Sequence, residues 1–309
     1  MTSVLYDVPG PRAMARNRIL GVLTVVVVLA IIGFFVWRLA ATGQFTAQKW
    51  SAFTYTNVWI SIGNAALATV SAFAAAAVGA LALGFVLAIG RMSDHAWVRR
   101  PFIAIVEVLR AVPVLVFMFL LYYGLPVAGI KMEPYWAVVI ALIVYNGSVL
   151  AEVIRAGVES LPRGQHEAGY ALGLRKAGVM RLILLPQALR AMLPVIIAQL
   201  VVTLKDTALG YIITYEELLF YARYIGGQVT YGSPIVPATI IVAIIYIGLC
   251  LLLSLVATTV EKRLRSSAKV GVVAGANQPT QEVTDTELIL AQRSGKFDSN
   301  TGNTGGGGI

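Results

Sequence analysis

The stretch GQHEAGYALGLRKAGVMRLILLP, residues 164–186, lies between two long apolar runs but is itself basic and amphipathic. Ala168, Ala171 and Leu174 fall on one side of a helix drawn through it, because residues three and four apart share a helical face. The stretch is too polar for the interior of a bilayer, and its helical pattern breaks near Gly173. It therefore predicts a basic helical segment on one side of a membrane, outside the lipid.

The composition is that of an integral membrane protein. Of the 309 residues, 58% are hydrophobic and 13% are charged, and the mean hydropathy is +0.79. Soluble domains carry about a quarter charged residues, so this chain has too few charges for one. The net charge of +9 does not indicate nucleic-acid binding, because the basic residues form short clusters next to apolar runs, where they set membrane orientation.

Six apolar runs are long enough to cross a bilayer as helices, which takes about 20 residues. They cover residues 19–37, 62–89, 102–123, 136–154, 191–213 and 235–256. The first run is too long for a cleavable signal peptide, and no small-residue cleavage site follows closely, so we interpret it as a retained helix. The predicted fold class is an all-α polytopic membrane protein with six transmembrane helices.

The distribution of basic residues predicts the orientation of these helices. Arginine and lysine gather before the first run, between the second and third, between the fourth and fifth, and after the sixth: Arg12, Arg16, Arg18; Arg91, Arg99, Arg100; Arg163, Arg175, Lys176, Arg181, Arg190; Lys262, Arg263 and Arg265. The alternate connections carry fewer, such as Lys49, Lys131 and Arg223. Cytoplasmic loops are enriched in these residues, so both termini and the segment 164–186 are expected in the cytoplasm of a cell-membrane protein.

The second run carries small residues at every fourth position, namely Ala68, Ala72, Ala76, Ala80, Gly84 and Ala88. Such a row lets another helix approach closely, so we interpret it as a tight helix–helix seam. The alternative is that alanine is simply common in this run, since it also occupies positions 74, 75 and 77.

The third run contains two charges on one helical face, Glu107 and Arg110, three residues apart. A charge inside a membrane helix costs about 2.5–3.5 kcal/mol on insertion scales, so it usually faces the bundle interior or a water-filled path. The two residues could form an internal ion pair or present charge to a polar cargo. Pro113 follows them, and both a bend beside a transport path and a packing kink are open.

Polar residues also interrupt the fourth and fifth runs. Asn146 could hydrogen-bond to another helix or contact cargo. Lys205 and Asp206 are adjacent, so their side chains point about 100° apart and at least one needs a partner. The stretch KDTALG that they open could line a path or end the helix before a re-entrant segment. Glu107, Arg110, Asn146, Lys205 and Asp206 are thus the candidate residues of a substrate path.

The sequence carries no recognisable catalytic or metal-binding set. It lacks the nucleotide-binding pattern G-x-x-x-x-G-K-[ST], the zinc pattern H-E-x-x-H and the nucleophile pattern G-x-S-x-G. One cysteine, Cys250, and two distant histidines, His95 and His166, make neither a disulfide framework nor a metal cluster. We therefore expect no enzyme activity and no cofactor on this chain, and any uphill transport would draw on an ion gradient or another subunit.

The segment quoted above resembles the cytoplasmic loop of permease subunits of bacterial ATP-binding-cassette (ABC) importers, whose pattern is E-A-A-x3-G-x9-I-x-L-P. The matching positions are Glu167, Ala168, Gly169, Gly173, Ile183, Leu185 and Pro186. Gly169 replaces the second alanine of the pattern. This departure keeps the helix face shallow, although glycine weakens a helix by up to about 1 kcal/mol.

Three further stretches resemble polar amino acid permeases, and the likeness covers about residues 62–256. LRAVPVLVFMFLLYYGLP at 109–126 is similar to R-G-T-P-L-L-V-Q-x-x-x-x-Y-Y-G-L, and AEVIRAGVESLPRGQHEA at 151–168 to A-E-x-x-R-G-G-x-x-S-x-x-x-G-Q-x-E-A. LPQALRAMLPVIIAQLVVTLKDTALG at 185–210 is similar to L-P-Q-A-x-R-x-x-x-P-x-x-x-N-x-x-x-x-x-x-K-D-T-S-L. The chain departs from these patterns at Ala111, Val112, Gln199 and Ala208.

The resemblance implies a type I ABC importer fold, with a five-helix permease core over residues 61–260 and a cytoplasmic coupling loop at about 158–190. Residues 1–60 would add a cytoplasmic N-terminus, an extra first helix and an external loop. Residues 261–309 would form a cytoplasmic tail, whose polar, Gly- and Thr-rich composition predicts disorder.

The partners implied by the resemblance are membrane lipid, a second permease subunit, two ATPase subunits that hold ATP and magnesium, and an extracytoplasmic solute-binding protein; nucleic acid is not among them. The second permease subunit would be identical or similar to this chain. The coupling helix would dock on the ATPase through Gln165, Glu167, Ala168, Gly169, Ala171, Leu172, Gly173 and Pro186. There Glu167 would pair with a basic residue, and the small residues would allow close approach.

The function implied by the resemblance is ATP-driven import of a polar amino acid, with glutamate or a related acidic or amide amino acid as the first candidate. Arg110 and Lys205 are the possible partners of a cargo carboxylate. The alternative is a stand-alone ion-coupled transporter or channel, which would be active in liposomes with an ion gradient and without ATP.

Overall fold

The computed structural model describes residues 10–266, with side chains to residue 263. These residues form helices joined by turns, and no strand occurs among them. The described helices belong to one compact unit that ends at Arg265. The disorder predicted for the tail falls almost wholly on residues 267–309, outside the described residues.

Five long apolar helices match five of the predicted membrane runs: α1 (Pro11–Ala41), α3 (Thr56–Arg91), α7 (Pro134–Glu159), α10 (Leu185–Asp206) and α12 (Ile235–Ser266). The third run corresponds to a bent pair, α4 (Ala96–Ala111) followed by the segment Val114–Val127. Counting this pair as one span gives six crossings within residues 10–266, as predicted.

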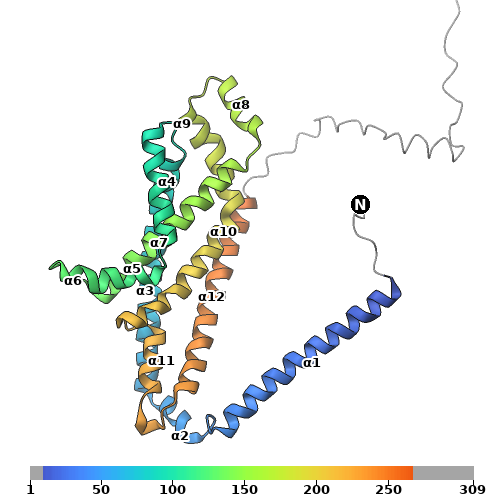
Figure 1. Cartoon of the computed structure of the whole chain (residues 1–309), viewed down its shortest axis with the longest axis vertical. Coiled ribbons are helices and arrows are strands. Elements are labelled where there is room, and N and C mark those ends of the chain that lie inside the picture. Colours follow the sequence, from blue (N-terminus) through green and yellow to red (C-terminus); the bar gives the residue numbers. More distant parts are fainter. Residues whose placement is uncertain (1–9, 267–309) are drawn as a thin grey trace, which may run out of the picture. The chain divides into compact units, whose positions relative to one another are not determined.

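Pro113 divides the third predicted run into two helices. The backbone is extended at Val112, where ψ is 124°, and the two parts of the run meet at 93° (Figure 1). A proline cannot donate a backbone hydrogen bond, and it disfavours helical geometry at the residue before it. The span predicted over residues 102–123 is therefore present as a bent pair of helices, with the bend at the proline. The second part comprises α5 (Val114–Phe119), the π-helical turn η2 (Leu120–Gly124) and α6 (Leu125–Val127).

The row of small residues in α3 forms a close seam with α7. Ala72, Ala76, Ala80 and Ala88 are fully buried, and a Cβ at Gly84 would lie 2.9 Å from both the Gly147 carbonyl oxygen and Leu150 Cβ. The two backbones therefore approach as closely as the small side chains allow. This seam, which was one of two interpretations of the sequence, makes α3 and α7 the centre of the unit.

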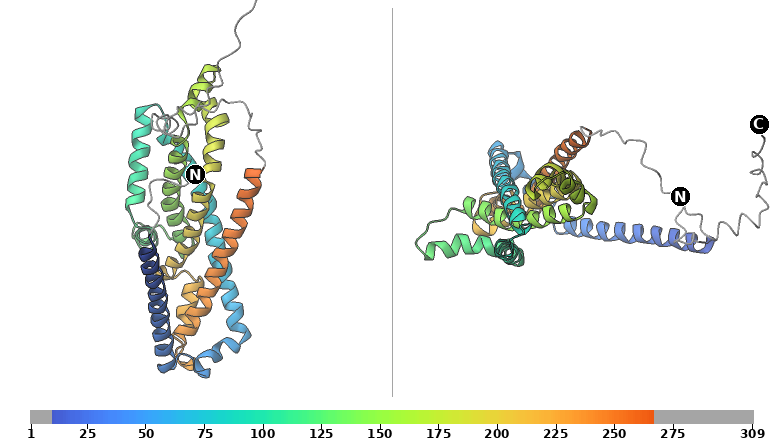
Figure 2. Two further views of the ribbon diagram at one scale, coloured as in Figure 1. Left: turned by 90° about the vertical axis from the view of Figure 1, so that its right-hand side faces the viewer. Right: turned by 90° about the horizontal axis from the view of Figure 1, so that it is seen from above.

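Short elements occupy the two ends of the unit (Figures 1 and 2). α8 (Arg163–Ala171) and α9 (Lys176–Gly178) lie near the start of α4, at what we call the α8 end. α2 (Ala47–Trp50) and α11 (Leu218–Gly226) lie at the opposite α11 end. The remaining turns are η1 (Ser51–Thr54), the π-helical η3 (Val179–Leu184), η4 (Thr207–Ile213) and η5 (Val229–Tyr231).

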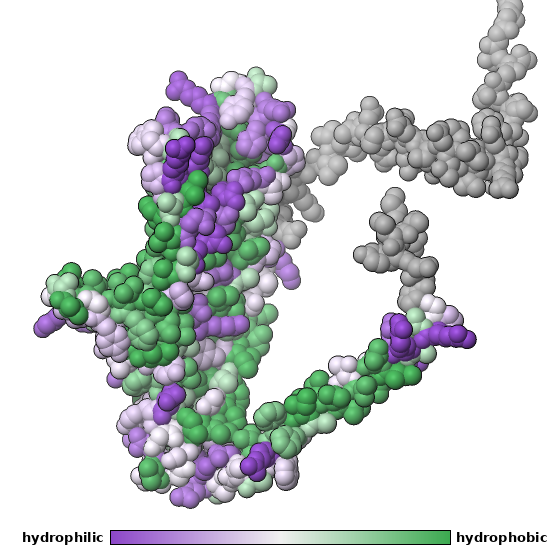
Figure 3. Space-filling model, in the orientation of Figure 1, coloured by the Kyte–Doolittle hydropathy of each residue, from purple (hydrophilic) through white to green (hydrophobic). Residues whose placement is uncertain are grey.

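Two helices expose apolar surface along most of their length. No residue of α1 is buried, and its surface is hydrophobic except near its ends (Figure 3). In the most apolar window of α12 only 6% of the residues are buried. A helix that is hydrophobic on all sides and not covered by protein is suited to contact with lipid. These exposed faces therefore agree with a membrane environment.

Candidate functional site

Helix α8 owes its length to a proline and a glycine. It begins directly after Pro162 and ends before Gly173, where φ is +74°. At this turn the Gly173 N–H donates to the Tyr170 carbonyl at 2.9 Å, and the Leu174 N–H donates to the Gly169 carbonyl at 3.2 Å. These two bonds form a Schellman motif, which needs a left-handed residue that glycine provides without strain. The predicted break near Gly173 is thus the C-terminal end of α8.

Gly169 lies on the inner side of α8, against the turn η3. It is buried, and a Cβ at this position would lie 2.8 Å from Val179 Cγ2 and 3.2 Å from Ile183 Cδ1. The glycine that replaces the family's alanine is therefore required by packing within the chain. The proposed contact of Gly169 with an ATPase stays a prediction, but the structure places this residue away from the exposed face.

The outer side of α8 presents a shallow surface. Of the residues predicted to couple to an ATPase, Gln165, Glu167, Ala168, Ala171, Leu172 and Gly173 are exposed. Leu172 has 79% of its surface exposed and Tyr170 has 48%, so apolar groups are available for docking at the end of the helix. Small residues between them leave room for another backbone to approach.

Two of the coupling candidates, Pro186 and Gln165, lie near the start of α10. Pro186 is half-buried near the start of α10, directly after the π-helical turn η3, so it lies within a continuous helical stretch that begins at Lys176. Its missing N–H leaves a carbonyl of the preceding turn without the usual helical donor. Gln165 accepts a hydrogen bond at 3.4 Å from the side-chain amide of Gln187, which also donates to the Ile183 carbonyl at 2.9 Å. These contacts connect α8 to α10, the helix that continues into the membrane.

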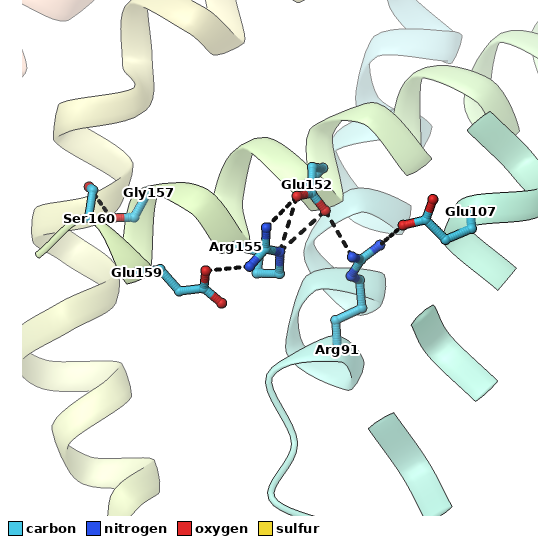
Figure 4. A network of polar contacts seen from close by, with 7 residues as sticks. All are labelled: Arg91, Glu107, Glu152, Arg155, Gly157, Glu159 and Ser160. Atoms are coloured by element: carbon cyan, nitrogen blue, oxygen red, sulfur yellow. Dashed lines mark hydrogen bonds and ion pairs between the residues drawn. The ribbon is translucent and has the colours of Figure 1, made fainter. Parts of the chain in front are cut away.

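The charged candidates of the third run point to different surroundings. Glu107 lies 3.6 Å from the guanidinium of Arg91 at the end of α3, so its partner comes from another helix rather than from Arg110. Arg110 is exposed. The interpretation of Glu107 as an interhelical ion pair therefore has a geometric basis, and Figure 4 shows the network to which it belongs.

Asn146 connects α7 to α10. It is fully buried, and its side-chain oxygen accepts a hydrogen bond of 2.7 Å from the amide of Gln199. Its own amide donates to the Leu142 carbonyl at 3.1 Å. Gln199 is one of the departures from the family pattern, and its longer side chain makes this contact. A role of Asn146 in cargo binding stays a prediction.

Lys205 and Asp206 mark the end of α10. After them the chain continues as the 3₁₀ turn η4, so the structure shows the helix end that was one of two interpretations. Lys205 is exposed and borders a cavity of about 480 Å³ beside α12, while Asp206 is half-buried. The five path candidates are therefore spread over the length of the unit rather than gathered in one place.

A larger cavity of about 770 Å³ lies at the α11 end, between the starts of α3 and α7 and the helix α11. We call it the α11 chamber. Its polar lining consists of Ser61, Asn64, Glu133, Thr214 and Glu216, with four tyrosines around them. Among the described residues that line it, none is basic. Such a chamber can accept hydrogen bonds from a cationic group and can stack against its apolar part.

The α11 chamber could not be predicted from charges inside the apolar runs. The lining residues lie at the starts of helices and in the turn after the fifth run. One signal was present: Ser61 and Asn64 are three residues apart at the beginning of α3 and therefore share a face.

Residues 80–266 match the family of the binding-protein-dependent transport system inner membrane component. The chain belongs to this family. It is a multi-pass inner-membrane protein and a component of a transport system. The family match begins within α3, so α1 and α2 lie outside it.

Two bacterial permeases are among the relatives of this chain. The glutamate transport system permease protein GluD of Corynebacterium glutamicum is 37% identical over 249 residues, which cover 79% of this chain and 90% of that protein. The probable glutamine ABC transporter permease protein GlnP of Bacillus subtilis is 38% identical over 159 residues, covering 52% and 73%.

Solved structures with the same fold are ABC transporters. The crystal structure of an amino acid ABC transporter with histidines matches with a TM-score of 0.61 and 30% identity, covering 69% of this chain and 97% of the other. An inward-facing MetNI methionine transporter matches with a TM-score of 0.58 but 17% identity, which supports the fold alone. The fold is thus that of a type I ABC importer permease, as the resemblance implied.

Proposed function

We propose that this chain is the membrane-spanning permease subunit of an ATP-driven importer for a polar amino acid. The observation that carries the proposal is α8, a short helix outside the spans with an exposed shallow face and a buried glycine that seats it on η3. A helix of this kind is suited to dock in a cleft of another protein. Both termini and α8 lie in the cytoplasm in this proposal, as the arginine and lysine distribution predicts.

The driving energy comes from a partner. Two copies of this chain, or this chain with a similar subunit, form the path, and two ATPase subunits with ATP and magnesium dock on the α8 helices. A solute-binding protein delivers the cargo at the α11 end. ATP-driven closure of the ATPase pair shifts the path between outward and inward access only if α8 docks with different free energy in the two states.

The α11 chamber is the proposed place where cargo first contacts this chain. Glu133 and Glu216 can accept hydrogen bonds from the α-ammonium group that all amino acids share. Glutamate remains the first candidate cargo, because the relative GluD is named for it. Arg110 and Lys205, expected to pair with a cargo carboxylate, lie outside the chamber lining, so they would act later on the path.

The proposal is tested by isolating the complex and measuring transport. The tagged chain is purified from native membranes, its partners are identified by mass spectrometry, and the complex is placed in liposomes with enclosed ATP and magnesium. Uptake of labelled glutamate, glutamine and arginine is then compared in the presence of the co-purified solute-binding protein. We expect uptake that requires ATP and the ATPase. Uptake by this chain alone, driven by an ion gradient, would instead support the ion-coupled alternative and end the proposal.

A further inference from the structure

An ion-pair network joins three helices at the α8 end (Figure 4). Arg91 is the last residue of α3, and only 8% of its side-chain surface is exposed. Its guanidinium lies 3.1 Å from the Glu152 carboxylate on α7 and 3.6 Å from the Glu107 carboxylate on α4. Arg91 is therefore the point at which α3, α4 and α7 meet through charge.

The network continues along α7 toward the coupling loop. Glu152 also accepts hydrogen bonds from Arg155, and Arg155 in turn pairs with Glu159, the last residue of α7. From Glu107 to Glu159 the charges alternate in sign, so each inner member has an opposite charge on both sides. The chain of ion pairs thus ends where the polypeptide leaves α7 for α8.

A second contact reaches the same place from the other side of α8. Lys176 opens α9, directly after the turn that ends α8. Its ammonium group donates to the Met92 carbonyl at 3.0 Å and forms an ion pair with Asp94. Residues 91–94 are the end of α3 and the turn after it. They therefore contact the chain on both sides of α8, through Glu152 before it and Lys176 after it.

The Arg91–Glu152 contact is more buried than the Lys176–Asp94 contact. The Arg91–Glu152 pair is largely buried, and removing one member would leave an uncompensated charge away from water. Arg91 also keeps Nε and Nη1 without a hydrogen-bond partner among the described residues, while Glu107 is 60% exposed and only within ion-pair distance. Arg91 therefore has donors left for Glu107 while it keeps its contact with Glu152.

We propose that residues 91–94 receive the movement of the α8 segment and pass it to α3 and α4. Arg91 is a positioning residue, because its contact with Glu152 connects the end of α3 to α7, the helix before α8. Asp94 makes the corresponding contact with Lys176 in α9, the helix after α8. The inference rests on the proposed function, since it needs an ATPase that moves α8. It adds the residues through which that movement reaches the helices of the path.

The test separates coupling from simple stability by measuring cargo transported per ATP hydrolysed. Complexes carrying Arg91→Met, Glu152→Gln, Asp94→Lys or Lys176→Asp are compared with wild type in liposomes containing ATP and magnesium, with labelled glutamate, glutamine and arginine outside. We expect ATP hydrolysis to persist and the cargo-to-ATP ratio to fall at least about fivefold for the Arg91 and Glu152 variants, the lower end of typical allosteric coupling. A purely structural role would lower the amount of complex or both rates together.

Control variants keep the test decisive. Lys262→Met, at an exposed position in α12, should leave the ratio unchanged, and Arg91→Lys should keep most of it. The double variant Asp94→Lys with Lys176→Asp restores opposite charges at this pair but not the bond to the Met92 carbonyl, so it should recover part of the ratio lost in each single variant, even if Arg91→Met fails to assemble. Unchanged ratios in every single variant of a wild-type complex that transports would overturn this inference alone. A wild-type complex without ATP-dependent uptake would overturn the proposed function instead.

Discussion

The α8 end and the α11 end of the unit are held by different kinds of polar contact. At the α8 end, ion pairs join α3, α4 and α7, and several of their members are exposed. At the α11 end, hydrogen bonds with fixed partners are buried: the Tyr215 hydroxyl donates to the Ala68 carbonyl at 2.7 Å, and the Leu218 N–H donates to Thr69 Oγ1 at 3.3 Å.

Glu217 shows this difference most clearly. It is fully buried and caps α11 by accepting hydrogen bonds from the Leu219 and Phe220 N–H groups at 2.9 and 2.7 Å. The Tyr246 hydroxyl of α12 donates to the same carboxylate at 2.6 Å. Both carboxylate oxygens of Glu217 accept hydrogen bonds, whereas Nε and Nη1 of Arg91 have no hydrogen-bond partner within residues 10–266. The comparison indicates a fully hydrogen-bonded frame beside the α11 chamber and an incompletely hydrogen-bonded network at the α8 end.

The largest effect on stability is expected from Glu217→Ala. The substitution removes the cap of α11 and leaves three partly buried donors without an acceptor, at a cost of about 3 kcal/mol. Thermal unfolding of the purified complex in detergent measures it. The neighbouring Glu216→Ala, at an exposed position, is the matched control and should keep the wild-type midpoint. If Glu217→Ala and Glu216→Ala unfolded at the same temperature, the hydrogen bonds of Glu217 would not stabilise the α11 end, and the proposed contrast between the two ends would be wrong.

Two neighbouring positions on α8 distinguish its inner and outer faces. Gly169→Leu should destabilise the packing of α8 on η3 by about 2 kcal/mol, because the added side chain meets Val179 and Ile183. Ala168→Leu creates the same side chain on the exposed face, so it should keep the unfolding midpoint but reduce the amount of ATPase that co-purifies. The opposite pattern, with Ala168→Leu destabilising and Gly169→Leu blocking the ATPase, would show that Ala168 faces η3 and Gly169 faces outward.

Gly173 tests the turn that ends α8. Gly173→Ala should cost about 1 kcal/mol, because its φ of +74° disfavours any residue with a Cβ, and it should lower uptake in proportion to complex assembly. Gly173→Trp adds bulk at an exposed position as well, so it should abolish ATP-driven uptake and ATPase stimulation while the protein remains inserted. Normal uptake by the tryptophan variant would show that nothing docks at this turn.

The smallest effect is expected from the exposed pair Asp94–Lys176. The hydrogen bond from Lys176 holds the pKa of the Asp94 carboxyl below its ordinary value of 3.8. Stability from a lowered carboxyl pKa is present above the unfolded-state pKa and is lost as the pH falls through the folded-state pKa. The difference in unfolding midpoint between wild type and Asp94→Asn should therefore be constant from neutral pH down to about 5 and decrease as the pH falls further. High salt should also reduce it, and a difference that grows on acidification would contradict the assignment.

The sequence predicted most of the fold but not the partners of its polar residues. The six apolar runs located the spans because a bilayer forces each crossing segment to satisfy its own backbone, which leaves a long local signal. Gly173 indicated the end of α8, because a left-handed turn depends on only a few consecutive residues. Pro113 indicated a bend, but only the structure gave the angle of 93° between the two helical parts.

Tertiary structure alone decided what those residues contact. Arg91 meets Glu152 and Glu107 because α3, α7 and α4 pack side by side, and the α11 chamber exists because the starts of α3 and α7 leave a space beside α11. Gly169 faces inward only because η3 lies against it. The sequence by itself thus determined where helices begin, end and enter lipid, since these depend on neighbouring residues and solvent. Ion pairs and cavities depend on distances between residues far apart in the chain, and only the packing of the helices fixes those distances.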